Sequence, residues 1–208
     1  MLHLCLIKID PDFAYENYLH WFDLDTQKKI QSYHFKMDQL RAFVSALLKY
    51  YYIPNQLNLN INKIKYNYNQ HQRPYLQGYS DKFDINLSHS GVYVLLGISD
   101  TTIGVDVEEI NPKTEINSIA KIVFSPQEQQ LINNNLNNFY TLWSKKESYL
   151  KACGGGFFEQ YQSTNINLDL IEIKPKYQIH GIIFDDRYSA AVCLYDNFKR
   201  DPFLKKFK

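Results

Sequence analysis

Two apolar segments of strand length, separated by only four residues, constrain the fold of this chain most strongly. Residues 92–98 read VYVLLGI, residues 103–107 read IGVDV, and polar residues lie between them. Short apolar runs with polar boundaries are typical of β-strands buried in a protein core. The chain therefore needs a sheet with a covered face, and 208 residues are enough to build a sizeable core around it.

Helical patterns on either side of these strands predict an α+β (α/β-like) fold. In residues 38–52 the apolar side chains recur every three or four positions, as in an amphipathic helix: Leu40, Phe43, Val44, Leu47 and Leu48. We expect Pro54 to end this helix, because proline cannot continue the hydrogen-bond pattern. Residues 139–151 predict another helix, closed by the glycines at 154–156. Ser125 and Glu128 form a helix-start signature with Pro126 between them.

Four further segments predict strands. Residues 83–87 alternate between apolar and polar side chains, and residues 88–91 interrupt that alternation, so we expect the strand to end there. The apolar N-terminus lacks a basic region and predicts a buried first strand, not a signal peptide. A terminal strand pair is expected around Asp185 and Asp186. The predicted segments are residues 1–7, 83–87, 177–184 and 188–195.

The order of helices and strands suggests a weak internal repeat. A helix around Val44 precedes the strand of residues 92–98, and a helix around Lys145 precedes the strand that follows Ala190. The separation is about 50 residues in both cases, a spacing of the kind found in internal repeats. Two similar α+β lobes, residues 1–100 and 101–208, would explain the repeat, although one such coincidence can also arise by chance.

The charge balance excludes a general affinity for polyanions. The chain has 23 Lys and Arg against 22 Asp and Glu, a net charge of +1. We therefore expect neither nucleic acid nor a membrane surface as a partner, and any bound anion must be held by a local cluster. No apolar run approaches the roughly 20 residues of a membrane span. The three cysteines lack metal-binding spacing and predict reduced thiols in a cytoplasmic protein.

Acidic residues on a predicted strand are the first candidates for chemistry. Asp106 and Glu108 are two positions apart, so their side chains share one face of the strand, and Val105 and Val107 take the other. Hard cations such as Mg²⁺ take oxygen ligands of this kind. The alternative is a strand end with solvated acids.

A helical pair and a polar corner are the next candidates. Glu147 and Lys151 are one helical turn apart and share a face, as they also would in a plain surface ion pair. Ser88 and His89 stand at the predicted strand end, where hydroxyl, imidazole and backbone donors could hold phosphate. A nucleophilic Ser–His arrangement is disfavoured, because neighbours in a strand point apart.

Basic residues complete the set of candidates. Lys28, Lys29, Lys36 and Arg41 precede or open the first amphipathic helix, and Arg73 lies just before the strand that leads to His89. Each is unremarkable alone, but together with the carboxylates they would suit a polyphosphate ligand. The lysines and arginine near the C-terminus, residues 199–200 and 205–206, are interpreted as a solvated tail.

In order and spacing, these segments resemble the 4′-phosphopantetheinyl transferases of the surfactin type. The resemblance extends over roughly residues 29–156. It rests on short motifs that together are specific: Arg73-Pro74, Asn86-Leu87-Ser88-His89-Ser90, Gly104-Val105-Asp106-Val107-Glu108, Phe124-Ser125-Pro126-Gln127-Glu128 and Trp143-Ser144-Lys145-Lys146-Glu147-Ser148-Tyr149-Leu150-Lys151. It implies two pseudo-twofold α+β lobes with the active site in the cleft between them. It also implies transfer of the phosphopantetheine arm of coenzyme A to a Ser of a carrier protein, releasing 3′,5′-ADP.

The same resemblance implies a role for each candidate. Asp106, Glu108 and Glu147 match the family's Mg²⁺ ligands, and Glu147 or a water beside it would take the proton of the carrier Ser. Lys151 matches the lysine at the pyrophosphate. The positions that match coenzyme A contacts are Ser88 and His89 for the phosphates, Arg73 in the nucleotide-binding loop and Lys29 at the 3′-phosphate.

Several points stay open at this level. The family often has a second basic residue shortly after the position of Lys29, where this chain has Gln31 and Ser32, and Lys36 or Arg41 could substitute. A non-catalytic binding module of the same fold and a Mg²⁺-dependent nucleotide hydrolase are the alternative functions. The carrier could be acyl or peptidyl. We expect a monomer, since a two-lobed chain can build the cleft alone.

Overall fold

A computed structural model describes residues 1–70, 73–154, 172–173 and 177–195. In its first half a three-stranded antiparallel sheet has the order β1-β5-β4. A two-stranded ribbon, β2 and β3, precedes β4 along the chain. The strands are β1 (Leu2–Lys8), β2 (Tyr66–Tyr68), β3 (Pro74–Leu76), β4 (Asp84–Ser90) and β5 (Tyr93–Ser99), and the helices are α1 (Leu24–Gln31), α2 (Lys36–Leu47) and α3 (Ile53–Gln56).

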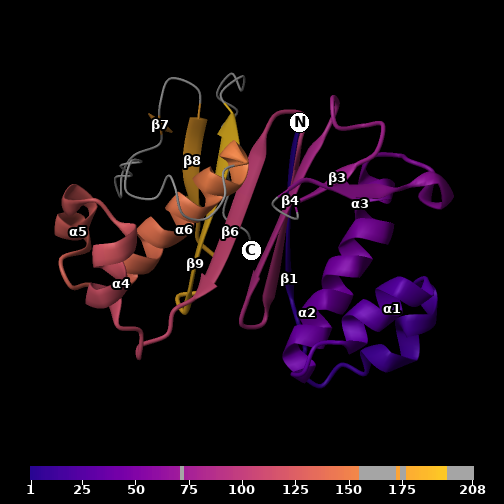
Figure 1. The fold of residues 1–208 in the computed structure, drawn as a ribbon, viewed down its shortest axis with the longest axis horizontal. Coiled ribbons are helices and arrows are strands. Elements are labelled where there is room, and N and C mark those ends of the chain that lie inside the picture. The colour runs from indigo at the N-terminus through magenta and orange to yellow at the C-terminus, as the bar shows by residue number, and fades with distance from the viewer. Residues whose placement is uncertain (71–72, 155–171, 174–176, 196–208) are drawn as a thin grey trace.

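The second half builds a sheet of its own. Its order is β6-β9-β8-β7, and all neighbouring strands are antiparallel. The elements are β6 (Ile103–Glu109), β7 (Glu172–Ile173), β8 (Tyr177–Ile182), β9 (Tyr188–Tyr195), α4 (Ile116–Val123), α5 (Pro126–Ile132) and α6 (Leu136–Cys153). Helices α1 to α3 lie at one end of the long axis, α4 and α5 lie at the other, and the strands of the two larger sheets are between them (Figure 1).

Three apolar clusters hold these layers together. One packs α2 against the first sheet, around Phe43 and Val94, and another packs α6 against the second sheet, around Tyr149 and Ala191. The third joins the inner faces of the two sheets, with Leu95 of β5 against the valines of β6 and β9. Because burial of apolar area drives folding, the third cluster makes the two sheets one body and fixes where β4 meets β6.

The mixed α+β class and most expected elements are confirmed. The strands at the N-terminus and around residues 92–98 and 103–107 form within one or two residues of their predicted bounds, and so does the terminal strand pair. The capping box at Ser125 and Glu128 is present. Helix α6 ends at Gly154, whose left-handed φ of 68° suits glycine. The predictions for residues 155–156 and for the basic tail concern positions outside the described residues.

Two expected boundaries are wrong. Pro54 does not end the first helix, because it occupies the first turn of α3, where its missing N–H is not needed. A π-helical segment, Leu48–Tyr52, connects α2 to α3. Residues 88–90 also do not interrupt their strand, since β4 continues to Ser90. Ser88 and Ser90 look like loop residues, but their hydroxyls bond the backbone of β6.

No helix within the described ranges is long and apolar enough to cross a membrane.

Candidate active site

A pocket of about 240 Å³ opens where β4, β6 and α6 meet. It brings together six of the residues that the sequence singled out. Strand β4 contributes Ser88 and His89, β6 contributes Asp106 and Glu108, and α6 contributes Glu147 and Lys151. Leu87 and Trp143 supply the apolar part of the lining. Three segments far apart in sequence thus converge on one small acidic pocket with one lysine.

Asp106 is the most buried acid of this pocket, with 1% of its surface exposed. Its Oδ1 accepts hydrogen bonds from Lys151 Nζ at 2.6 Å and from Ser88 Oγ at 3.0 Å. Its Oδ2 is buried and has no hydrogen-bond partner among the described residues. A buried carboxylate oxygen without a partner costs free energy, so this atom is arranged for a ligand.

Glu108 is held next to Asp106 at an energetic cost. Burial, followed by repulsion from the Asp106 carboxylate, raises the pKa of Glu108 to about 7. Trp143 Nε1 donates to its Oε1 and Ser90 Oγ donates to its Oε2, both at 3.2 Å, and both bonds oppose the rise. A cation between the two carboxylates would remove the repulsion.

Lys151 provides the positive charge of the pocket. Burial is the largest single influence and would lower the pKa of Lys151, but Asp106, Glu147 and Glu108 together raise it above its ordinary value. The ammonium also donates to Ser88 Oγ at 3.1 Å. Lys151 is therefore protonated at neutral pH and links α6 to both β4 and β6.

The donor set suits a hard divalent cation. The pocket offers carboxylates, one of them with a free buried oxygen and another with a raised pKa, and no thiol. Oxygen ligands of this kind are the ones that Mg²⁺ takes. Within the described ranges, however, no three His, Cys, Asp or Glu side chains form a group that could hold a metal ion. Convergence of Asp106, Glu108 and Glu147 on one Mg²⁺ therefore stays a prediction.

The close packing of α6 on β6 delivers Glu147 and Lys151 to this pocket. A Cβ on Gly104 would lie 1.9 Å from the carbonyl oxygen of Ser148 and 2.5 Å from the backbone nitrogen of Ala152. Only glycine lets the helix backbone approach the strand so closely.

We expect Gly104→Ala to force α6 away from β6, because the added methyl meets backbone atoms. The variant should lose about 1–3 kcal/mol of the free energy of unfolding, the range of overpacked cores. Chemical denaturation measures this loss. Gly181→Ala on β8 is the matched control, since nothing lies within 4 Å of a Cβ there. Equal stability of the two variants would contradict the role of the close approach.

A second pocket, of about 220 Å³, adjoins the first, and His89 lines both. Lys29 of α1 and Lys49 of the π-helical segment lie on its wall, next to Tyr68. The ammonium group of Lys29 lies 5.8 Å from the centre of the Tyr68 ring, and that of Lys49 lies 5.9 Å from it. Lys49 Nζ also donates to the Tyr68 hydroxyl at 3.3 Å. The sequence pattern singled out Lys29 but missed Lys49.

A signal for Lys49 was present in the helix pattern. Ala42, Ser45, Ala46 and Lys49 all line this second pocket, at the spacing of one helical face. Small side chains that precede a lysine on one face leave room for a ligand beside the helix. Lys49 lies in the same pocket as Lys29, whereas Gln31, Ser32, Lys36 and Arg41 line neither pocket. The identity of the second basic contact stays a prediction.

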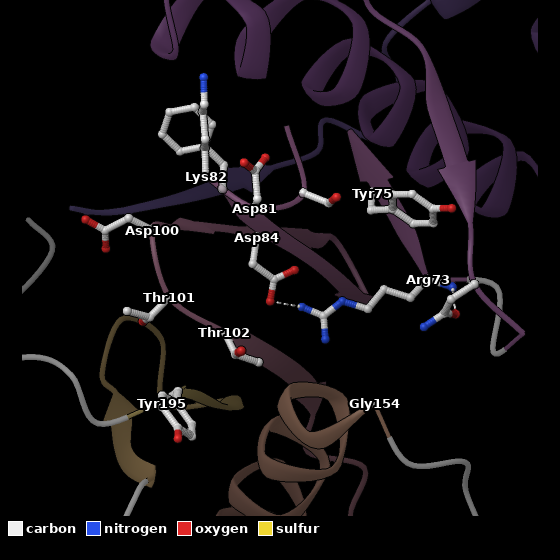
Figure 2. Close-up of a pocket in the computed structure, with 13 residues that line it drawn as sticks. Arg73, Tyr75, Asp81, Lys82, Asp84, Asp100, Thr101, Thr102, Gly154 and Tyr195 are labelled. Carbon is white, nitrogen blue, oxygen red and sulfur yellow. Dashed lines mark hydrogen bonds and ion pairs between the residues drawn. The ribbon is translucent and has the colours of Figure 1, made fainter. Parts of the chain in front are cut away.

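The two arginines among the candidates lie elsewhere. Arg41 Nε donates to the carbonyl of Gly91 at 2.8 Å, and its guanidinium pairs with Asp38. Arg73 forms an ion pair with Asp84 at 2.6 Å and donates to the carbonyls of Ile103 and Lys151. Figure 2 shows the Arg73–Asp84 pair on the wall of a third, polar pocket of about 480 Å³. The structure does not bring Arg73 to the two pockets that share His89.

Comparisons with known proteins identify the family of this chain. Residues 12–101 match the family model of the 4′-phosphopantetheinyl transferase N-terminal region, and residues 102–197 match that of the 4′-phosphopantetheinyl transferase superfamily. The 4′-phosphopantetheinyl transferase psf-1 of Bacillus pumilus is 30% identical over 176 residues, which cover 78% of this chain and 74% of the relative. The 4′-phosphopantetheinyl transferase Sfp of Bacillus subtilis (strain 168) is 25% identical over 191 residues, 86% of this chain and 84% of the relative.

The chain therefore belongs to the 4′-phosphopantetheinyl transferase superfamily. It is an enzyme that transfers phosphopantetheine to carrier proteins.

Proposed function

We propose that the enzyme transfers the 4′-phosphopantetheine arm of coenzyme A to a Ser hydroxyl of an acyl or peptidyl carrier protein, with Mg²⁺, and releases 3′,5′-ADP. The observation that carries the proposal is the pair of adjoining pockets that share His89. One pocket holds three carboxylates and Lys151, and the other holds Lys29 and Lys49. A ligand with a pyrophosphate and a separate phosphate fits such an arrangement of charges.

The residues of the acidic pocket divide the chemistry between them. Asp106, Glu108 and Glu147 would hold Mg²⁺, which when bound neutralises charge on the pyrophosphate oxygens. Glu147 accepts the proton of the carrier Ser while the Ser oxygen attacks the phosphorus atom of the phosphopantetheine arm. Lys151 stabilises the charge that grows on the leaving phosphate. Phosphoryl transfer depends mainly on such positioning and charge neutralisation.

The residues of the basic pocket would bind the nucleotide end of coenzyme A. Ser88 and His89 contact the phosphates at the junction of the two pockets. Lys29 binds the 3′-phosphate, and Lys49 supplies the second positive charge, because both ammonium groups flank the ring of Tyr68. Arg41 would support this end through Asp38, which lines the basic pocket. Arg73 is held by Asp84 outside both pockets and is given no contact there.

The proposal extends to the organisation of the molecule. Residues 1–100 and 101–208 would form two α+β lobes with a pseudo-twofold relation, and the acidic pocket would lie between them. We also propose a cytoplasmic monomer. Size-exclusion chromatography with light scattering tests the monomer.

Mass spectrometry of the carrier tests the function. The enzyme is incubated with coenzyme A and Mg²⁺, with and without an apo carrier protein. A gain of the phosphopantetheine mass on the carrier supports transfer. Release of 3′,5′-ADP without carrier would indicate a hydrolase instead, and no turnover with any of a panel of apo carriers would indicate a non-catalytic module. Omission of Mg²⁺ should abolish the gain.

We expect Lys49→Ala to raise the KM for coenzyme A about tenfold, which corresponds to about 1.4 kcal/mol. The physical reason is the loss of one of two cations that face a phosphate. The same variant should leave the KM for 3′-dephospho-coenzyme A unchanged, since that substrate lacks the group. Lys63→Ala, at an exposed site outside the pockets, is the control. An equal rise for both substrates would refute the assignment to the 3′-phosphate.

A further inference from the structure

Strands β4 and β6 are edge strands of different sheets, and they run side by side (Figure 1). They are joined by side chains of β4 that accept hydrogen bonds from the backbone of β6. In every pair the two residues are nineteen positions apart, so the strands run in the same direction. The bonds are Ile103 N to Asp84 Oδ2 at 2.9 Å, Val105 N to Asn86 Oδ1 at 2.8 Å, Val107 N to Ser88 Oγ at 3.3 Å and Glu109 N to Ser90 Oγ at 3.0 Å.

The acceptors form a regular ladder. They occupy every second position of β4, so they share one face of the strand. In an antiparallel pair, alternate N–H groups of a strand face its partner and the others face away. The backbone N–H groups of β6 that point away from β9 would therefore have no partner at this edge. Each would cost a free energy comparable to that of a lost hydrogen bond. The ladder satisfies them and sets the register between the two sheets.

Three members of the ladder have other duties. Asp84 also pairs with Arg73 (Figure 2), Ser88 also bonds Asp106 and Lys151, and Ser90 also bonds Glu108. Asn86 lies between Asp84 and Ser88, with 6% of its surface exposed. It lines none of the three pockets described above. Its contact is the N–H of Val105, the residue directly before Asp106.

We infer that Asn86 is a positioning residue, which holds β6 against β4 so that Asp106 faces Ser88 in the acidic pocket. A neutral amide suits this place, because a carboxylate there would add to the negative charge of Asp106 and Glu108. The ladder links the half of the chain that carries Lys29 and Lys49 to the half that carries the acids and Lys151. The expected effect of Asn86 on catalysis rests on the proposed function. The expected protection of the Val105 N–H does not.

Amide hydrogen exchange and kinetics of Asn86→Ala and Asn86→Ser test the inference. Alanine lacks an acceptor, while serine supplies the hydroxyl that Ser88 and Ser90 already use. We expect Asn86→Ala to speed exchange of the Val105 amide at least tenfold relative to that of Val94, which lies in the central strand β5. We expect kcat to fall at least tenfold while KM for coenzyme A changes less than threefold. Asn86→Ser should restore most of the exchange protection at Val105 and most of kcat.

The controls separate positioning from stability. Ile53→Val, in the core of the first half, should lower stability without speeding exchange at Val105 relative to Val94. Should Asn86→Ala not fold, Asn86→Cys replaces it, because a thiol is a weak acceptor close to serine in size. Unchanged relative exchange at Val105 in the acceptor-free variant would overturn the ladder. Unchanged kcat would overturn the positioning role. A wild-type enzyme that transfers nothing would refute the proposed function, and the exchange data would still decide the ladder.

Discussion

Glu147→Gln is expected to reduce kcat by a factor of about 10² or more, the scale of general-base catalysis. Glutamine keeps the size of the side chain, so packing on α6 is preserved. It removes the proposed acceptor of the carrier Ser proton, and it replaces one of the carboxylates that line the acidic pocket with a neutral amide. Steady-state kinetics with coenzyme A, Mg²⁺ and a saturating apo carrier measure the change.

Glu115→Gln is the control for this prediction, because Glu115 is exposed and lies outside the pocket. Near-wild-type kcat for Glu147→Gln would refute the catalytic assignment. Lys151→Ala should also reduce kcat, and Lys151→Arg should restore only part of it. A planar guanidinium does not replace a compact ammonium that reaches both Asp106 and Ser88.

Lys146→Ala is expected to destabilise the protein by about 3–5 kcal/mol, the cost of removing one partner of a buried ion pair. Lys146 is 1% exposed. Its Nζ donates to Glu128 Oε2 at 2.7 Å and to the carbonyl of Val123 at 3.1 Å, and it lies 5.1 Å from the centre of the Phe124 ring. Without the lysine, the Glu128 carboxylate stays buried beside α6. Urea denaturation measures the loss.

A second variant separates loss of the ion pair from simple loss of packing. Lys146→Met together with Glu128→Gln removes both charges and keeps an acceptor for the backbone N–H of Ser125, and replacement of both charged partners is often nearly neutral. The double variant should therefore be more stable than Lys146→Ala. Lys121→Ala, at an exposed position on α4, should be within about 0.5 kcal/mol of wild type. A loss of under 1 kcal/mol for Lys146→Ala would show that the pair contributes little.

Local patterns predicted the parts of the site that depend on one element. The period of two in a strand places Asp106 beside Glu108, and the helical turn places Glu147 beside Lys151. The short motif at Ser125 predicted a helix start that is present. Each of these inferences needed only residues within a few positions of one another.

The parts that were wrong or missed depend on contacts between distant segments. Ser88 and Ser90 looked like the end of a strand, because nothing nearby in the sequence explains why a polar run should continue it. The strand continues because both hydroxyls accept hydrogen bonds from the backbone of β6, nineteen residues further along the chain. Lys49 was missed because its relation to Lys29 arises only when α1 and α2 pack together. For the same reason, the sequence alone could not show that Arg73 pairs with Asp84 and donates to the carbonyls of Ile103 and Lys151.

The ladder between β4 and β6 also bears on how this chain avoids self-association. An edge strand with free N–H groups is a template for another chain, and proteins protect such edges by covering or interrupting them. Here β4 covers the edge of β6, since the side-chain oxygens of β4 accept hydrogen bonds from the N–H groups of β6. If the halves separated, these N–H groups of β6 would be exposed. Separation of the halves would therefore both dismantle the active site and open a surface for aggregation.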